Sequence, residues 1–404
     1  MTKKLDIWPS LPIVVDGHSH RGRNLDNLIA AIKHNDRVCE IDLRSFFGKW
    51  PGQLEKIVSV MKVPFPALTS LNLTLRTVHR TAPVLPDLFL GRSAPRLQHL
   101  ALGGVSFPGL PNLLLSAAGL VSLELRRIPH SWNISPNVMV AHLFALTRLE
   151  SLLLSFEFCR SHPDRDSHHS PPSTRTLIPA LTWLKFEGAN EYAEDLVTRI
   201  DTPRLDSLDI TFFNETVFDI SNLSQFISCR VPQFQAPPDG SHVTFFDDHI
   251  TAELSFSEPR DGRLMLGILC DESAGQLSSL IQLCRPLLPA FSTVERLYIC
   301  QYGDRRWKRW RHGIQDSHWL QLLQLFTDAK DLYVSHSIAK DFVPVLNGLV
   351  GERTTEVLPA LQNVLFYKYE TLLGPITIDD FISARKLSGH PVAVSCSDGY
   401  SLKH

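Results

Sequence analysis

The chain has 404 residues, of which 44% are hydrophobic and 20% charged, and its formal net charge is −2. This near-neutral balance argues against a surface made for nucleic acid or an anionic membrane. The seven cysteines are scattered without a Cys-x-x-Cys pair, which favours reduced thiols in a cytoplasmic or nuclear protein. We predict neither a signal peptide nor a transmembrane segment from this sequence.

Near the N-terminus, an apolar stretch ends in Asp16-Gly17-His18-Ser19-His20. An apolar strand followed by Asp-x-His-x-His resembles the first metal-binding strand of the amidohydrolase barrels, because two imidazoles at a strand end can hold zinc. Such an enzyme needs further spaced histidines at later strand ends, whereas the leucine-rich stretches here carry Asn72, Glu124 or Asp209 at these positions. We therefore predict a polar turn here and a protein without catalysis, metal or cofactor, and keep a metal-dependent hydrolase using His18 and His20 as an alternative.

Helical spacing of apolar residues follows this turn. Residues 1–37 are expected to form an N-terminal cap and a first helix with its stripe at 25–32, and a second stripe covers 54–61. Ser135-Pro136 combines a capping residue with proline at a helix start and predicts a helix over 138–143. Further helical stripes cover 277–288, 319–326 and 342–349.

Between the helical stripes a phrase of the form Pro-x-Leu-x-x-Leu-x-Leu recurs, as in Pro66-Ala67-Leu68-Thr69-Ser70-Leu71-Asn72-Leu73. Its copies lie at intervals of about 23 to 35 residues, which is typical of a leucine-rich solenoid. Alternating strands and helices predict an α/β fold in which a curved parallel sheet forms the concave face and the helices form the convex face. Such a surface is expected to bind rather than to catalyse.

The solenoid is expected to extend over 38–387, with 388–404 as a C-terminal tail. The polar, Pro/Ser/His-rich stretch 161–176 predicts a flexible loop. Irregular repeats are expected at about 230–270, inside a gap between Leu205 and Val294 in which the leucine phrase is absent. Strands are predicted there over 231–236, 243–246, 252–256 and 264–269, and Asp261-Gly262 marks the turn of a hairpin.

In each strand phrase the leucines point into the core, so the residues between them face the inner surface. Towards the C-terminal half this inner strip becomes larger and more aromatic, and exposed Trp, Tyr and Arg anchor many interfaces. The alternative is that these rings only cover the sheet and that binding uses loops. A basic, tryptophan-containing segment at 303–312 could join such a protein interface, whereas its use for nucleic acid is disfavoured by the net charge. The expected protein-binding surface consists of Trp183, Lys185, Arg296, Tyr298, Tyr333, Tyr367, Trp307 and Trp310.

Several short segments resemble a family of fungal F-box proteins with leucine-rich repeats. They include Leu5-Asp6-Ile7-Trp8-Pro9-Ser10-Leu11-Pro12-Ile13, Ala145-Leu146-Thr147-Arg148-Leu149-Glu150-Ser151-Leu152 and Leu387-Ser388-Gly389-His390-Pro391-Val392. The resemblance covers the repeats and implies that they select an unknown protein target for a Skp-cullin ubiquitin ligase. The family's F-box is not visible, because the apolar helical pattern that should follow Leu11-Pro12 is absent. Binding of the Skp adaptor is thus expected only if an F-box lies upstream, and a stand-alone repeat scaffold remains the alternative.

Overall fold

The computed structural model describes most of the chain. It forms two units, of which unit 1 comprises Met1–Gly188 and Tyr192–Leu205 and unit 2 comprises Ala189–Glu191 and Asp206–His404. The described residues are 11–17, 25–45, 51–75, 82–129, 132, 134–157, 175–213, 219–230, 232–246, 248–257, 261–269, 273–302, 314–349, 353–367 and 378–397.

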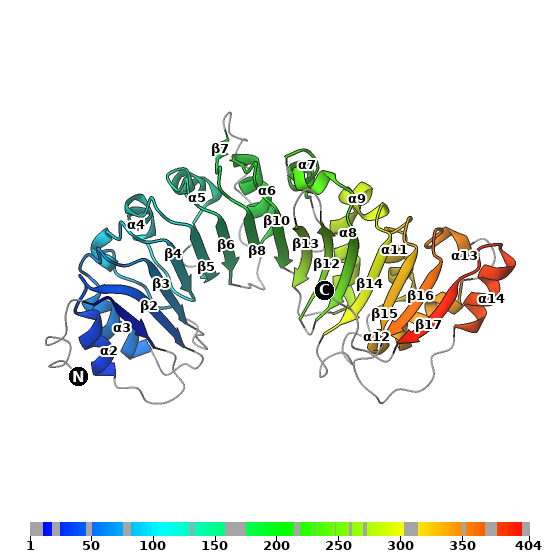
Figure 1. Cartoon of the computed structure of the whole chain (residues 1–404), viewed down its shortest axis with the longest axis horizontal. Coiled ribbons are helices and arrows are strands. Elements are labelled where there is room, and N and C mark those ends of the chain that lie inside the picture. Colours follow the sequence, from blue (N-terminus) through cyan, green and yellow to red (C-terminus); the bar gives the residue numbers. More distant parts are fainter. Residues whose placement is uncertain are drawn as a thin grey trace. The chain divides into compact units, whose positions relative to one another are not determined.

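Unit 1 contains a parallel sheet whose strands pair in the order in which they follow one another along the chain, with β7 left out (Figure 1). The strands are β1 (Ile13–Asp16), β2 (Val38–Ser45), β3 (Ser70–Leu75), β4 (His99–Gly103), β5 (Ser122–Ile128), β6 (Ser151–Phe156) and β8 (Trp183–Gly188). A separate short ladder joins β7 (Thr176–Leu177) to β9 (Ile200–Asp201).

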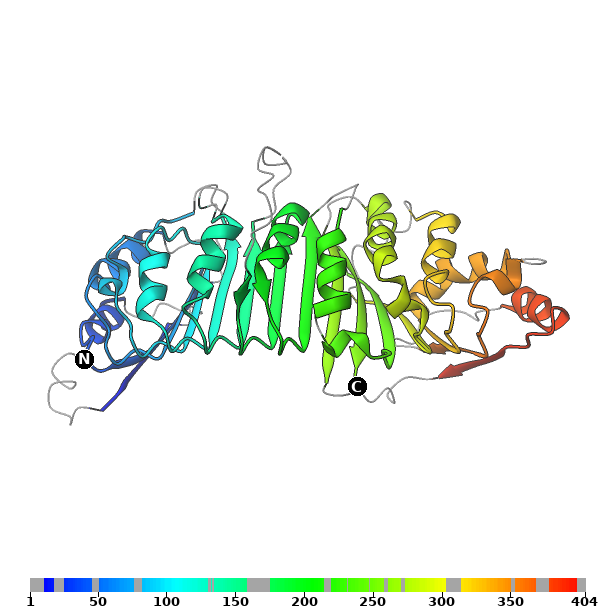
Figure 2. The ribbon, with the colours of Figure 1, turned by 90° about the horizontal axis from the view of Figure 1, so that it is seen from above.

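The helices of unit 1 return the chain from one strand to the next. Figure 2 shows α4, α5 and α6 in front of the strands, and Figure 1 shows these helices on one side of the strands only, so the other face of the sheet is open. The helical segments are α2 (Leu25–Ile32), α3 (Pro51–Val60), η1 (Phe89–Arg92), α4 (Leu110–Ser116), α5 (Pro136–Leu143) and α6 (Asn190–Arg199).

The leucine phrase explains this layering. Leu71 and Leu73 of β3 are buried, whereas the alternate residues Ser70 and Asn72 are partly exposed on the open face. The helix prediction from Ser135-Pro136 is also confirmed, because the Ser135 hydroxyl accepts a hydrogen bond from the Val138 backbone N–H at the start of α5. Each such cap contributes about 1 kcal/mol to helix stability.

Unit 2 has the same two layers but a different strand order, β10-β13-β12-β11-β14-β15-β16-β17. Its helical segments are α7 (Ser221–Arg230), η3 (Pro232–Gln235), α8 (Ser273–Cys284), η4 (Arg285–Leu287), α9 (Leu288–Ser292), α11 (Asp316–Leu323), α12 (His336–Asn347), α13 (Arg353–Glu356) and α14 (Asp379–Leu387). Its strands are β10 (Ser207–Phe213), β11 (Gly240–Phe245), β12 (His249–Phe256), β13 (Gly262–Leu269), β14 (Arg296–Gln301), β15 (Asp331–Ser335), β16 (Asn363–Tyr367) and β17 (Ala393–Ser397).

The irregular strand order arises in the gap between leucine phrases. The predicted hairpin is confirmed, since β12 and β13 pair antiparallel, and β11 also pairs antiparallel with β12. The outer strands of this meander run parallel to their neighbours, β13 to β10 and β11 to β14. The strand predicted over 231–236 is wrong, because Pro232–Gln235 forms a 3₁₀ helix. Proline at a helix start fits that conformation, since its missing N–H is not needed there.

The predicted helices at 25–32, 54–61, 138–143, 277–288, 319–326 and 342–349 all correspond to helical segments. A core of leucine, isoleucine, valine and phenylalanine side chains fills the space between strands and helices in both units. The fold class predicted from the sequence, an α/β leucine-rich-repeat-like solenoid, is therefore confirmed. Residues 161–174 of the expected loop lie outside the described part of the chain.

Candidate functional site

Three aromatic rings stack side by side on the open face of the unit 2 sheet. His242 of β11 is in register with Tyr298 of β14, which is in register with Tyr333 of β15. The His242 and Tyr298 ring centroids lie 4.4 Å apart with their planes 6° from parallel. Those of Tyr298 and Tyr333 lie 4.3 Å apart at 10°. We call His242, Tyr298 and Tyr333 the aromatic row; each side chain is partly exposed.

Polar side chains border the aromatic row on the side where the strands begin. Arg296 is exposed, and its Nε donates a hydrogen bond of 3.1 Å to the carbonyl oxygen of Asp239. Asn363 Nδ2 donates one of 2.7 Å to Asp331 Oδ1 on the neighbouring strand. Burial, followed by the neighbouring Tyr333, raises the pKa of Tyr298, while the positive charge of Arg296 opposes this shift. The Tyr298 hydroxyl therefore stays protonated at neutral pH.

Tyr367 of β16 is held differently from the other predicted tyrosines. Its side chain is only 4% exposed, and its hydroxyl lies 2.7 Å from the Sγ of buried Cys300. Burial raises the pKa of the Cys300 thiol, and the hydrogen bond with Tyr367 partly offsets that shift. Tyr367 thus supports the sheet beside the aromatic row rather than forming part of its exposed edge.

Two further predicted site residues belong to unit 1. Trp183 and Lys185 are partly exposed on β8 in unit 1, where Lys185 Nζ forms an ion pair of 3.0 Å with Glu187. Trp307 and Trp310 lie outside the described residues, and so do His18 and His20. The structure consequently brings together Tyr298, Tyr333 and Arg296, and it adds His242, which the sequence did not single out.

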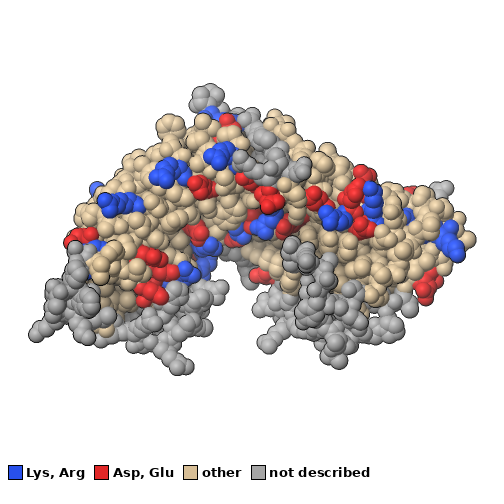
Figure 3. All heavy atoms as spheres, in the orientation of Figure 1, with Lys and Arg blue, Asp and Glu red and all other residues tan. Residues whose placement is uncertain are grey.

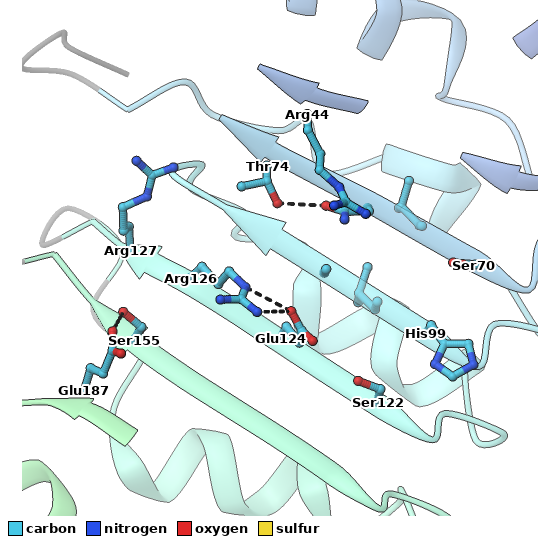
Figure 4. Close-up of a pocket in the computed structure, with 14 residues that line it drawn as sticks. Arg44, Ser70, Thr74, His99, Ser122, Glu124, Arg126, Arg127, Ser155 and Glu187 are labelled. Atoms are coloured by element: carbon cyan, nitrogen blue, oxygen red, sulfur yellow. Dashed lines mark hydrogen bonds and ion pairs between the residues drawn. The ribbon is translucent and has the colours of Figure 1, made fainter. Parts of the chain in front are cut away.

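Unit 1 carries a second feature on its open sheet face, a hollow of about 630 Å³ over β2 to β8 (Figure 4). Its lining includes the small residue Ala101 of β4. Arg44 of β2 and Arg126 of β5 extend along the sheet on either side of β3 and β4. Alternation along the strand places both arginines on the open face, because each directly follows a buried leucine, Leu43 or Leu125.

Carboxylates on the same strands orient the two arginines of the hollow. Arg44 Nε and Nη2 lie 3.0 Å and 2.7 Å from the two carboxylate oxygens of Asp42. Arg126 Nε and Nη2 lie 2.9 Å and 2.7 Å from Glu124 Oε2. Side chains two residues apart on a strand share one face, which is why these pairs form.

Basic and acidic side chains alternate on the face that Figure 3 shows. Figure 3 shows basic and acidic side chains interspersed, without a large area of one sign on the face in view. Within the described ranges, no group of three or more His, Cys, Asp or Glu residues could hold a metal ion. None of the helices found among those residues is long and apolar enough to cross a bilayer.

Two solved structures are similar to this chain in their fold. No protein-family model and no curated protein matches this chain. Among solved structures, the leucine-rich repeat-containing protein LegL7 from Legionella pneumophila is similar at 14% identity, covering 82% of this chain and 94% of its own, with a TM-score of 0.31. An internalin from Listeria monocytogenes is similar at 13% identity, covering 85% of this chain and 89% of its own, with a TM-score of 0.28. Identities and TM-scores this low transfer no function to the chain.

Proposed function

We propose that this chain is a non-catalytic protein-binding repeat module whose partner docks on the open sheet face of unit 2. The aromatic row carries the proposal, because it combines large rings with hydroxyl groups on a surface that the helices leave uncovered. Tyrosine contributes much contact area at low entropic cost and is enriched among the residues that dominate binding energy. Stacking fixes the rings before the partner arrives, so little side-chain entropy remains to be lost on binding.

The proposal can be tested by combining photo-crosslinking with binding measurements. A photoreactive residue at Leu365, which is in register with Tyr333, would trap the partner in cells for identification. A matched control places the same residue at the exposed Leu288, on a helix of unit 2. Affinity for the purified partner is then compared among the original chain, Tyr298→Ala/Tyr333→Ala and Tyr298→Phe/Tyr333→Phe.

We expect the double alanine variant to lose at least about 2 kcal/mol of binding free energy, as hot-spot tyrosines do. The double phenylalanine variant keeps both rings and should lose far less. Unchanged affinity of the double alanine variant would refute docking on this face and leave the loops as the binding surface.

More specifically, we propose that the repeats recognise the substrate of an F-box-type Skp-cullin ubiquitin ligase in the cytoplasm or nucleus. The support is the sequence resemblance set out above, and the five described cysteines, all free thiols, suit a reducing compartment. The test asks whether the Skp adaptor co-purifies with this chain, or only with a version extended upstream if the gene encodes more residues. Capture by either places the protein in a ligase.

A stand-alone repeat scaffold is the rival if neither version captures the adaptor. The second rival, a metal-dependent hydrolase, would use His18 and His20. Zinc content measured after mild chelation separates it from the binding module. About one zinc per chain, lost when both histidines are changed to alanine, would replace the proposal with the enzyme.

A further inference from the structure

The last strand of unit 2, β17, has a second edge that pairs with none of the described strands. It pairs in parallel with β16 on its other side, and Figure 1 shows it as the outermost strand of unit 2 with α14 beside it. Successive residues of a strand direct their N–H and C=O groups alternately to one side and the other. The Ala393 N–H donates to the carbonyl oxygen of Gln362 at 2.8 Å, so Ala393 bonds towards β16. Ser395 does the same by alternation, whereas Val394 and Cys396 direct their backbone groups to the open edge.

The core is also uncovered at this edge. The side chains of Val394 and Cys396 point to the core side of the sheet, because they are in register with Val364 and Phe366 of β16. Val364 and Phe366 are 0% and 2% exposed, whereas Val394 is 36% exposed and Cys396 is exposed as well. Leu387, the last residue of α14, is 90% exposed. The final core residues of a repeat array need a cover, and the described residues provide none for this strand.

The edge strand of unit 1, β1, is protected in two ways. Its core-side residues Ile13 and Val15 are 9% and 2% exposed, although β1 also pairs with a single described strand. It ends in Asp16, and a charge on an edge strand opposes pairing with another chain. The sequence of β17, Ala-Val-Ser-Cys-Ser, contains no charged residue. Open backbone groups on an uncharged edge strand favour pairing with a further strand.

We propose that two copies of this chain associate through β17, paired antiparallel about a two-fold axis at Ser395. The backbone pattern is self-complementary, because this register places Val394 of one copy opposite Cys396 of the other, and both residues direct their N–H and C=O groups to the shared edge. Each of the two Val394–Cys396 pairs therefore forms two hydrogen bonds, and the two Ser395 residues meet in the non-hydrogen-bonded position. The pairing also covers the exposed side of Val394.

A second copy fits this edge better than the other occupants do. Pairing of β17 with β1 of another copy would join unlike edges, would place Asp16 beside the new pair and would give an open-ended chain of molecules rather than a closed dimer. An extended segment of another protein could satisfy the same backbone groups, but only a second copy does so in the purified chain.

The dimer has a consequence for binding. The two-fold axis of an antiparallel strand pair stands perpendicular to the sheet, so both copies of unit 2 present their open faces on the same side. Two aromatic rows are then offered to a partner that carries repeated binding segments, and such a partner binds with higher avidity without any new contact.

Sedimentation equilibrium of the purified full chain tests the association. With rising concentration, the weight-average mass should increase from 45.5 kDa towards twice that value. One pair of short strands buries little surface, so we expect a weak dimer with a dissociation constant of about 1–100 µM. A mass that stays at 45.5 kDa up to about 300 µM would overturn the inference.

Two substitutions of Val394 locate the contact. Val394→Lys introduces a charge at the uncovered edge, and Val394→Pro removes an N–H group that the pairing with β16 does not use. Each should weaken dimerisation at least about tenfold. The matched control, Val14→Lys, places the same charge at a 60% exposed valine of β1 and should dimerise like the original chain. Circular dichroism shows whether each variant folds, and dimerisation that both Val394 variants leave unchanged would exclude this edge.

The register is tested with Ser395→Cys in a chain that also carries Cys396→Ser. In the proposed dimer the two introduced thiols belong to residues whose Cα atoms lie about 4.5 Å apart, which a disulfide can span. The two Cα atoms of residue 396 would lie about 8 Å apart, which is too far for a disulfide. Mild oxidation should therefore link the Ser395→Cys/Cys396→Ser chains and leave the original chain unlinked. No link in the double variant, or an equal link through Cys396 in the original chain, would contradict the antiparallel pairing at Ser395.

This inference and the proposed function can fail separately. Tyr298→Ala/Tyr333→Ala should dimerise like the original chain, because neither residue belongs to β17. If the chain stays monomeric while partner binding still depends on the two tyrosines, the dimer falls and the proposed function stands.

Discussion

The rings of Tyr298 and Tyr333 lie 4.3 Å apart and within 10° of parallel because the two residues are directly in register on adjacent parallel strands. Strand spacing in a sheet is about 4.8 Å, so two flat side chains at the same register stack almost without adjustment. Parallel register therefore turns two ordinary tyrosines into one continuous aromatic surface.

The first prediction concerns alkaline pH. Burial raises the folded-state pKa of Tyr298 above its usual value of 10.0, so folding favours the protonated phenol. This contribution to stability is fully present below about pH 10 and is lost as pH rises through the folded-state pKa. Urea unfolding should show that the original chain loses more free energy of unfolding across this range than Tyr298→Phe, which cannot ionise there. Identical pH dependence of the two proteins would contradict the shift.

The second prediction concerns Gly104, which has a φ of 66° directly after β4. A Cβ at this position would lie 2.5 Å from the carbonyl oxygen of Leu75. Gly104→Ala should therefore reduce the free energy of unfolding of unit 1 by about 1–3 kcal/mol. The matched control is Gly275→Ala in α8, where a Cβ meets nothing within 4 Å. That variant should be neutral or more stable by up to about 1 kcal/mol, because alanine favours helix.

The third prediction concerns Arg385 of α14, whose side chain is fully buried in unit 2. Its Nη1 donates to the carbonyl oxygen of Thr354 at 2.9 Å, and its Nη2 donates to those of Leu361 at 2.9 Å and Leu358 at 3.3 Å. Arg385→Leu leaves these carbonyls without their donor and should cost at least about 2 kcal/mol in urea unfolding. Lys386→Ala, at the exposed neighbouring position, should change stability by less than about 0.5 kcal/mol.

The fourth prediction concerns thiol reactivity. Cys229 and Cys396 are exposed, whereas Cys284 and Cys300 are buried and burial raises the pKa of both buried thiols. Because the thiolate is the reactive form, iodoacetamide should modify the two exposed cysteines in the folded protein and the two buried ones only after unfolding. Mass spectrometry of the digested protein reads out each site. Modification of Cys284 at the rate of Cys229 in the folded protein would show that the core of unit 2 opens.

Much of this fold could be predicted because the leucine phrase encodes burial with the period of a strand. The spacing of Leu71 and Leu73 identifies a strand and the face that it buries. Ser70 and Asn72, which alternate with them, identify its open face. Ser135 identified a helix start because hydroxyl capping is a local interaction that the sequence shows directly. The expected binding surface included Tyr298 and Tyr333 for the same reason, since alternation alone places them on the open face.

Features that depend on contacts between distant segments could not be predicted. Alternation predicts exposure for Tyr367, yet its hydroxyl reaches Cys300, two strands away, and the ring is buried. Arg126 and Arg127 both line the hollow of unit 1 where β5 shifts its register against β6, and the sequence of that stretch does not predict the shift. The strand predicted over 231–236 came from apolar composition alone, which does not distinguish a short strand from a 3₁₀ turn.

The reversed meander of β11, β12 and β13 changes how unit 2 can fold. In a simple solenoid each repeat contacts only its neighbours, so structure can nucleate anywhere and spread outward one repeat at a time. Within unit 2, β10 pairs with β13, which is synthesised only after β11 and β12, and the parallel partner of β11 is β14, which comes later still. We therefore expect the stretch from β10 to β14 to fold as one cooperative step, unlike the repeats whose strands pair in chain order. A ribosome-bound chain that ends at β12 holds strands whose parallel partners have not yet been made.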